Sequence, residues 1–152
     1  MKAVIQRVRR ARVTVGEEIV GEIGHGLCVL VGVERGDEPT DAQELARKLV
    51  NLRIFEDEAG KMNLSVKDVG GSLLLVSQFT LLGDTRRGHR PGFSQAMEPE
   101  GAARLFEECV AAVGAQGVPV ATGRFRAEML VSLENDGPVT ILVDTRARAG
   151  SS

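Results

Sequence analysis

Two short polar motifs are the parts of this sequence best suited to chemistry. The first, Ser77-Gln78-Phe79-Thr80, follows an apolar run over residues 73–76 and puts hydroxyl and amide groups where a buried strand should end. A threonine hydroxyl can act as a nucleophile, but only beside a base. Such side chains at a strand end also satisfy nearby backbone groups. The motif therefore predicts either a pocket wall that takes part in catalysis or an ordinary strand end.

The second motif, Asn135-Asp136-Gly137-Pro138-Val139-Thr140, separates apolar runs at residues 129–133 and 139–143. Proline cannot donate to a sheet ladder, so it does not belong inside a paired strand. An X–Pro bond is also the one place where a cis peptide costs little free energy. Gly137 and Pro138 could therefore turn backbone carbonyls outward as a recognition surface. The alternative is a plain tight turn between two strands.

Other catalytic constellations have little support. The two histidines, His25 and His89, stand apart, and His25 lies in Gly24-His25-Gly26, which we expect to be a hairpin turn. Nothing near either histidine supports a Ser-His-Asp triad. A zinc site needs three or four ligands close together, and the histidines and cysteines are scattered, so we expect no metal. No phosphate-binding glycine motif occurs, so we expect no cofactor. Cys28 and Cys109 lack CxxC spacing and are predicted to be buried reduced thiols.

Arginines gather in two places, and phosphate contacts are one use for them. They are Arg86, Arg87 and Arg90 in an aperiodic stretch, and Arg7, Arg9, Arg10 and Arg12 near the N-terminus. The alternative is an exposed charged loop and a strand edge. The formal net charge of −2 and the pI near 5.8 argue against non-specific binding of long nucleic acid. Contact with the end of an RNA remains compatible with this charge.

The length of 152 residues predicts one domain, over residues 1–146, followed by a flexible tail at 147–152. The first residues lack the apolar core of a signal peptide. No apolar run approaches the ~20 residues that cross a membrane. We therefore expect a cytoplasmic protein with no membrane partner.

Apolar spacing predicts strands and two long helices. Strands are expected at residues 3–8, 13–15, 19–23, 26–33, 73–76, 118–122, 129–133 and 139–143, with a hairpin turn at 16–18. One helix should cover 39–53, with Thr40 and Gln43 as a capping box. A second should begin at Pro99 and stop at Gly114 and Gly117. Residues 84–91 should form a loop.

These elements predict an α+β fold, with two main helices packed on one face of a mostly antiparallel sheet. The apolar strands leave the other face of the sheet in need of cover. A barrel-like curl of the sheet or a symmetric partner chain would supply that cover.

In their order and spacing, the two polar motifs together resemble the paired signatures of the D-aminoacyl-tRNA deacylases, the D-tyrosyl-tRNA(Tyr) deacylase family. The likeness runs from Ile5-Gln6-Arg7-Val8 to Val143. Further blocks that resemble the family are Arg53-Ile54-Phe55, Gly60-Lys61-Met62-Asn63-Leu64, Arg90-Pro91, Phe93-Ser94 and Thr122-Gly123-Arg124-Phe125.

The resemblance implies a homodimer whose Gly137–Pro138 bond is cis and enters the pocket of the other subunit. The two carbonyls would face the α-carbon of the aminoacyl group, and Arg7 would brace the loop. Asn135 and Phe93 would join the substrate-binding set. The residues that line the catalytic pocket would be Ser77, Gln78, Phe79 and Thr80.

The implied activity is hydrolysis of the ester bond of D-aminoacyl-tRNA, and also of glycyl-tRNA mischarged on tRNA-Ala, with no DNA partner. Three alternatives remain. One is the related deacylase type with a trans Gly-Pro bond, which removes misattached L-alanine. Another is a non-catalytic nucleic-acid-binding relative, against which the acidic charge and the lack of a basic extension count. The third is a general esterase.

Overall fold

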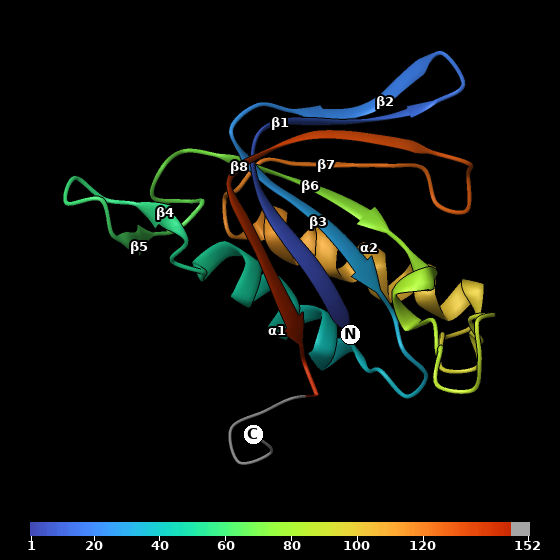
Figure 1. Ribbon diagram of the computed structural model, residues 1–152. Coiled ribbons are helices and arrows are strands. Elements are labelled where there is room, and N and C mark those ends of the chain that lie inside the picture. Colours follow the sequence, from blue (N-terminus) through green and yellow to red (C-terminus); the bar gives the residue numbers. More distant parts are fainter. Residues whose placement is uncertain (147–152) are drawn as a thin grey trace.

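The computed structural model describes residues 1–146, and it has a curled sheet with two long helices against one face (Figure 1). The expected tail at 147–152 lies outside the described residues. The strands of the main sheet are β1 (Lys2–Val15), β2 (Glu18–Ile23), β3 (Gly26–Gly32), β6 (Ser72–Ser77), β7 (Val120–Thr122) and β8 (Leu130–Asp144). The other elements are α1 (Pro39–Asn51), β4 (Phe55–Glu56), β5 (Met62–Leu64), the short 3₁₀ helix η1 (Phe79–Leu82) and α2 (Pro99–Ala115).

The long strand β1 organises the sheet. It pairs antiparallel with β8 along one edge and with β2 and then β3 along the other. Ala11 lies opposite Ile23 and Val8 lies opposite Gly26, so β2 and β3 keep one register and act as a single bent strand. The expectation of a hairpin turn at His25 is therefore wrong, because the chain bends there without reversing.

Two further strands join in parallel. β6 pairs with β3 and β7 pairs with β6, both in the parallel direction. Parallel neighbours need a crossover connection, and α1 and α2 lie in the two crossovers. Crossovers of one hand put both helices on the same face. The mostly antiparallel sheet with two helices on one face is thus confirmed, with two parallel pairs added.

The sheet curls until β2 and β7, the two ends of the strand order, nearly meet, which confirms the expected barrel-like shape. A Cβ atom on Gly21 of β2 would overlap the carbonyl oxygen of Thr122 in β7. Only glycine permits so close an approach of two backbones. The curl encloses a second apolar cluster, separate from the core beneath the helices. Its buried members are Val8, Ala11, Val13, Ile23, Cys28, Leu74 and Val76.

Both helices begin at a proline, as expected, but the cap of α1 differs. The Glu38 N–H donates to the Asp41 carboxylate at 2.9 Å, so the capping box precedes the expected pair Thr40 and Gln43. Pro39 takes the first helical position, where its missing N–H costs nothing. At the other helix the Glu98 carboxylate accepts from the Gly101 N–H, and α2 continues through Gly114 to end at Ala115.

β8 is one strand where the sequence suggested two. Gln6 lies opposite Thr140 and Val8 lies opposite Asn135, so Arg7 alone faces residues 136–139. Gly137 and Pro138 therefore lie in a bulge of four residues within a continuous strand. The alternative of a plain tight turn is wrong, because β8 keeps pairing with β1 on both sides of the bulge. A bulge is one of the few places in a sheet that tolerates proline.

Both cysteines are free and buried, as the sequence predicted. Among residues 1–146, no helix has the length and apolar character needed to cross a membrane.

Candidate active site

The three parallel strands β3, β6 and β7 end at the same edge of the sheet (Figure 1), and a cavity of about 610 Å³ opens there. Crevices beyond the carboxyl ends of parallel strands are common ligand sites, because the chain leaves each strand there in a loop. Most of the wall is apolar. The lining residues are Val33, Ser77, Gln78, Phe79, Thr80, Phe93, Ala96, Met97, Pro99, Ala102, Phe125, Arg126, Ala127 and Met129.

The motif at residues 77–80 forms the polar part of this wall. The Gln78 N–H donates to the Val31 carbonyl at 2.8 Å, which holds the end of β6 against β3. The chain then turns into η1, and the Gln78 Nε2 donates to the Thr80 Oγ1 at 2.9 Å. The first N–H groups of a helix have no acceptor inside it. The backbone N–H groups of Phe79 and Thr80, two residues of the lining, therefore have no acceptor within η1.

Two phenylalanines form an aromatic part of the wall. Phe79 and Phe93 meet edge to face, with ring centroids 5.0 Å apart. Phe79 is 59% exposed and Phe93 is 36% exposed, which is unusual for the least polar aromatic side chain. Exposed aromatic faces beside a cavity can stack on a planar ring of a ligand.

Among residues 1–146, no histidine, carboxylate or thiol belongs to the lining of the cavity. His25 packs edge to face on Phe55, and His89 lies in the exposed loop at residues 84–92. The one charged residue of the described lining is Arg126, which has a φ of 65°, a region that non-glycine residues rarely occupy. This lining therefore offers backbone donors, hydroxyl groups and an amide, but no side-chain base.

The Gly137–Pro138 motif forms a second cluster. The peptide bond is cis, and both residues are exposed. Arg7, which is only 7% exposed, donates through Nε to the Asp136 carbonyl at 2.9 Å and through an Nη to the Ile54 carbonyl at 2.7 Å. Arg7 thus contacts the bulge directly from the strand opposite.

Asn135 closes the base of the same bulge. Its Oδ1 accepts from the Val139 N–H at 2.7 Å, and its Nδ2 donates to the Val139 carbonyl at 3.2 Å. The side-chain amide replaces the ladder partners that the bulge removes. The contacts of Asn135 are therefore within the chain, and its expected role in substrate binding stays a prediction.

The structure separates the predicted site residues into two groups. Ser77, Gln78, Phe79, Thr80 and Phe93 line one cavity. None of the second group is part of that lining, and its members are Arg7, Asn135, Gly137 and Pro138.

Sequence reasoning gave no role to several residues of the cavity wall. Met97 precedes α2, and Phe125, Arg126 and Met129 lie between β7 and β8. The block at residues 122–125 was the one signal that pointed to this connection. Apolar residues in a loop carry no periodicity, so the other positions could not be identified.

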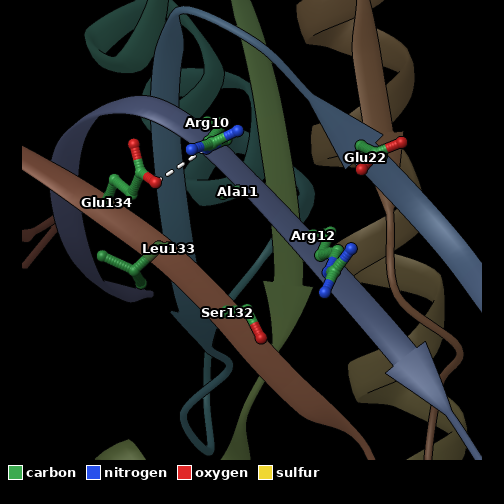
Figure 2. Close-up of a pocket in the computed structure, with 7 residues that line it drawn as sticks. All are labelled: Arg10, Ala11, Arg12, Glu22, Ser132, Leu133 and Glu134. Carbon is green, nitrogen blue, oxygen red and sulfur yellow. Dashed lines mark hydrogen bonds and ion pairs between the residues drawn. The ribbon is translucent and has the colours of Figure 1, made fainter.

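A smaller hollow of about 350 Å³ lies on β1, β2 and β8 (Figure 2). Arg10 and Glu134 form an ion pair across it at 2.7 Å. Its charges are largely matched, and it shares no lining residue with the cavity at the strand ends. The larger cavity is therefore the better candidate site.

Known proteins resemble this chain over nearly its full length. Residues 4–144 match the family model described as D-Tyr-tRNA(Tyr) deacylase. A protein of Desulforudis audaxviator named D-aminoacyl-tRNA deacylase is 60% identical over 146 residues, which cover 96% of this chain and 98% of that protein. A protein of the same name from Geobacter sulfurreducens is 55% identical over 152 residues, the full length of both chains.

Two solved structures resemble this fold. One, named c-Myc DNA Unwinding Element Binding Protein, is 43% identical, with a TM-score of 0.90 over 95% of this chain and 98% of that one. A second, described as a probable eukaryotic D-amino acid tRNA deacylase, has a TM-score of 0.78 over 93% of this chain and 97% of that one, and its 18% identity supports the fold alone. Since both the family model and the relatives span nearly the whole sequence, this chain belongs to the D-Tyr-tRNA(Tyr) deacylase family and is a hydrolase.

Proposed function

We propose that this protein hydrolyses the ester bond between a D-amino acid and the 3′ end of tRNA. The observation that carries the proposal is the cavity at the strand ends, whose polar wall is the motif at residues 77–80, in a chain of this family. Its relatives are named for that activity. The proposed location is the cytoplasm, where aminoacyl-tRNA is made.

The terminal adenosine and the ester occupy the cavity in this proposal. Phe79 and Phe93 offer aromatic surface for the base. The backbone N–H groups of Phe79 and Thr80 stabilise the oxyanion of the tetrahedral intermediate, and one such donor contributes about 3 kcal/mol. Since the described lining holds no side-chain base, the 2′-hydroxyl of the terminal ribose assists the attacking water, and Thr80 serves as a pocket wall.

Selection of the D hand needs a rigid obstacle, because mirror-image substrates have the same hydrophobicity and charge. The carbonyls of Gly137 and Pro138, supplied by a second copy of the chain, are the proposed obstacle. They accept hydrogen bonds from the α-ammonium group and leave no room for a side chain on the L side. Arg7 and Asn135 hold the bulge, and stiff main chain yields less to the wrong substrate than a side chain does.

A homodimer is proposed because the bulge is exposed and lies outside the cavity of its own chain. The neighbouring sheet surface has an apolar pair within a polar surround. Leu142 is 76% exposed and lies opposite Val4, and directly opposed residues share a face of the sheet. A twofold interface over this face would bury both side chains and carry the bulge toward the other cavity.

The test is ester hydrolysis on matched substrates, with tRNA charged with D-tyrosine or with L-tyrosine. We expect rapid loss of the D ester and little loss of the L ester. Equal rates would refute the chiral selection. Mischarged glycyl-tRNA-Ala should also be hydrolysed, whereas preference for L-alanyl-tRNA would identify the deacylase type with a trans Gly-Pro bond.

Two further measurements separate the remaining alternatives. Turnover of simple aryl esters without tRNA would indicate a general esterase. Tight binding of duplex DNA without turnover of any ester would indicate the DNA-binding activity for which the 43% identical relative is named. Light scattering reports the mass in solution, and a stable monomer would remove the shared site.

A further inference from the structure

The loop at residues 84–92 concentrates positive charge, and the proposed chemistry does not use it. It contains Arg86, Arg87, His89 and Arg90 against the single carboxylate of Asp84, in a chain whose formal net charge is −2. Residues 85–92 are all exposed. A compact cluster of positive charge raises the local concentration of anions, even on a protein that is acidic as a whole.

The loop is held in one shape. Asp84 and Gly92 exchange backbone hydrogen bonds of 2.7 and 2.8 Å, which close the loop at its base. The Asp84 carboxylate also accepts from Arg86, through Nε at 2.9 Å and an Nη at 2.7 Å. A loop ordered before binding loses less entropy when a ligand arrives.

Two of the arginines have no such partner. Within the described part of the chain, neither Arg87 nor Arg90 makes a hydrogen bond or an ion pair, whereas Arg86 is committed to Asp84. The planar guanidinium fork matches the geometry of phosphate oxygens. Arg87 and Arg90 are therefore the groups available to an anion.

Both ends of the loop join the wall of the cavity. The chain enters the loop from η1, whose first residues Phe79 and Thr80 line the cavity, and leaves it at Phe93, which lines the cavity too. A Cβ atom on Gly83 would lie 3.3 Å from the Phe93 ring and 3.5 Å from Pro91, so the two ends of the loop pack together. If the terminal nucleoside of a polynucleotide filled the cavity, the phosphates that precede it would lie outside the cavity, within reach of a loop that starts and ends at the wall.

We propose that Arg87 and Arg90 bind the phosphodiester backbone of the RNA strand that leads into the cavity. The inference rests on the proposed function in taking the 3′ end of tRNA as the occupant of the cavity. Single-stranded DNA offers the same phosphodiester chemistry, and RNA is chosen because the relatives are named for tRNA deacylation. The arginines act on binding and not on the ester itself.

The test measures how salt weakens the binding of uncharged tRNA. The variant Arg87→Gln with Arg90→Gln is compared with Arg47→Gln with Lys67→Gln, which removes two exposed positive charges from α1 and from the turn before the amino end of β6. Each phosphate contact on a single strand adds about 0.7 to the slope of log affinity against log salt, so two contacts add about 1.4. Between about 50 and 200 mM salt, the wild type should lose about sevenfold more affinity than the loop variant.

Turnover separates this inference from the proposed function. On D-tyrosyl-tRNA the loop variant should show a raised KM and an unchanged kcat, while on D-tyrosyl-adenosine, which has no phosphodiester, it should match the wild type. A DNA strand of the acceptor-end sequence should bind the wild type more weakly than the RNA does. A loop variant with the salt slope of the control, or a wild type that binds no tRNA, would overturn the inference. A wild type that binds tRNA with the expected slope but hydrolyses no ester would refute only the proposed function.

Discussion

Replacement of Arg7 by methionine removes the contacts that hold the bulge while it keeps most of the buried stem. The guanidinium bonds the carbonyls of Asp136 and Ile54, and the residue is only 7% exposed. A buried acceptor left without its donor costs about 1–3 kcal/mol. The bond to the Ile54 carbonyl is buried and the bond to the Asp136 carbonyl is part-buried, so water can solvate the second acceptor in part. With the gain from a charge that no longer has to be buried, we predict a loss of about 2 kcal/mol in the free energy of unfolding.

Circular dichroism in urea is the suitable assay, since the sequence has neither tryptophan nor tyrosine for fluorescence. Arg12→Met is the matched control, because Arg12 is exposed on the same strand and should change stability by less than about 0.5 kcal/mol. Arg7→Lys should recover little, because an ammonium group cannot reproduce the planar fork. If Arg7→Met unfolds at the same urea concentration as Arg12→Met, the bulge does not depend on these contacts.

The remaining predictions concern the cavity, the bulge and the thiols. Thr80→Val should keep turnover of D-tyrosyl-tRNA within about tenfold, and a loss above about 10⁴-fold would make Thr80 a nucleophile. Gly137→Ala should abolish D-ester hydrolysis in the same assay, because its φ is +146° and the new Cβ would lie 2.6 Å from a methyl group of Val139; Gly114→Ala, in open space on α2, should stay active. Burial raises the pKa of Cys28 to about 11 and of Cys109 to about 12, so the folded thiols hold their protons above the ordinary value of 9.0 and urea titrations should show stability falling as pH rises from about 9 to 12. In a variant with alanine at both cysteines, stability should fall less steeply over this pH range. An unchanged fall would show that the two thiols do not cause it.

The elements with strong local patterns could be predicted from the sequence. The apolar spacing of α1 and the proline at the start of α2 located both helices within a few residues. The run at residues 26–33 was expected to be buried on both faces. Successive residues of β3 are buried, so both of its faces are covered, and β1 and β6 pair with its two edges. These features depend on neighbours in the chain, which periodicity reports directly.

Strand direction and strand continuity could not be predicted, because they depend on partners distant in the sequence. An apolar run reads the same in either direction, so nothing indicated that β6 and β7 run parallel to β3. Gly24 and His25 look like a turn, yet β1 holds β2 and β3 in one register across them. The proline in β8 is tolerated because Arg7 and Asn135 supply the hydrogen bonds that the ladder loses there.

The position of the candidate site follows from the same long-range pairing. Parallel strands bring their carboxyl ends to one edge, so Val33, Ser77 and Phe125 reach one cavity from three distant parts of the chain. From residue types alone, only the segment that begins at Ser77 could be identified as a candidate. A hydroxyl and an amide at a strand end are unusual, whereas an apolar residue in a loop is not. In the proposed function, a cavity whose described lining holds no side-chain base and a braced main-chain bulge outside it are two incomplete halves of an editing site. A substrate ester that is already reactive needs little activation, so the greater demand is to reject the wrong hand, and rigid backbone from a neighbouring copy meets that demand without any reactive side chain.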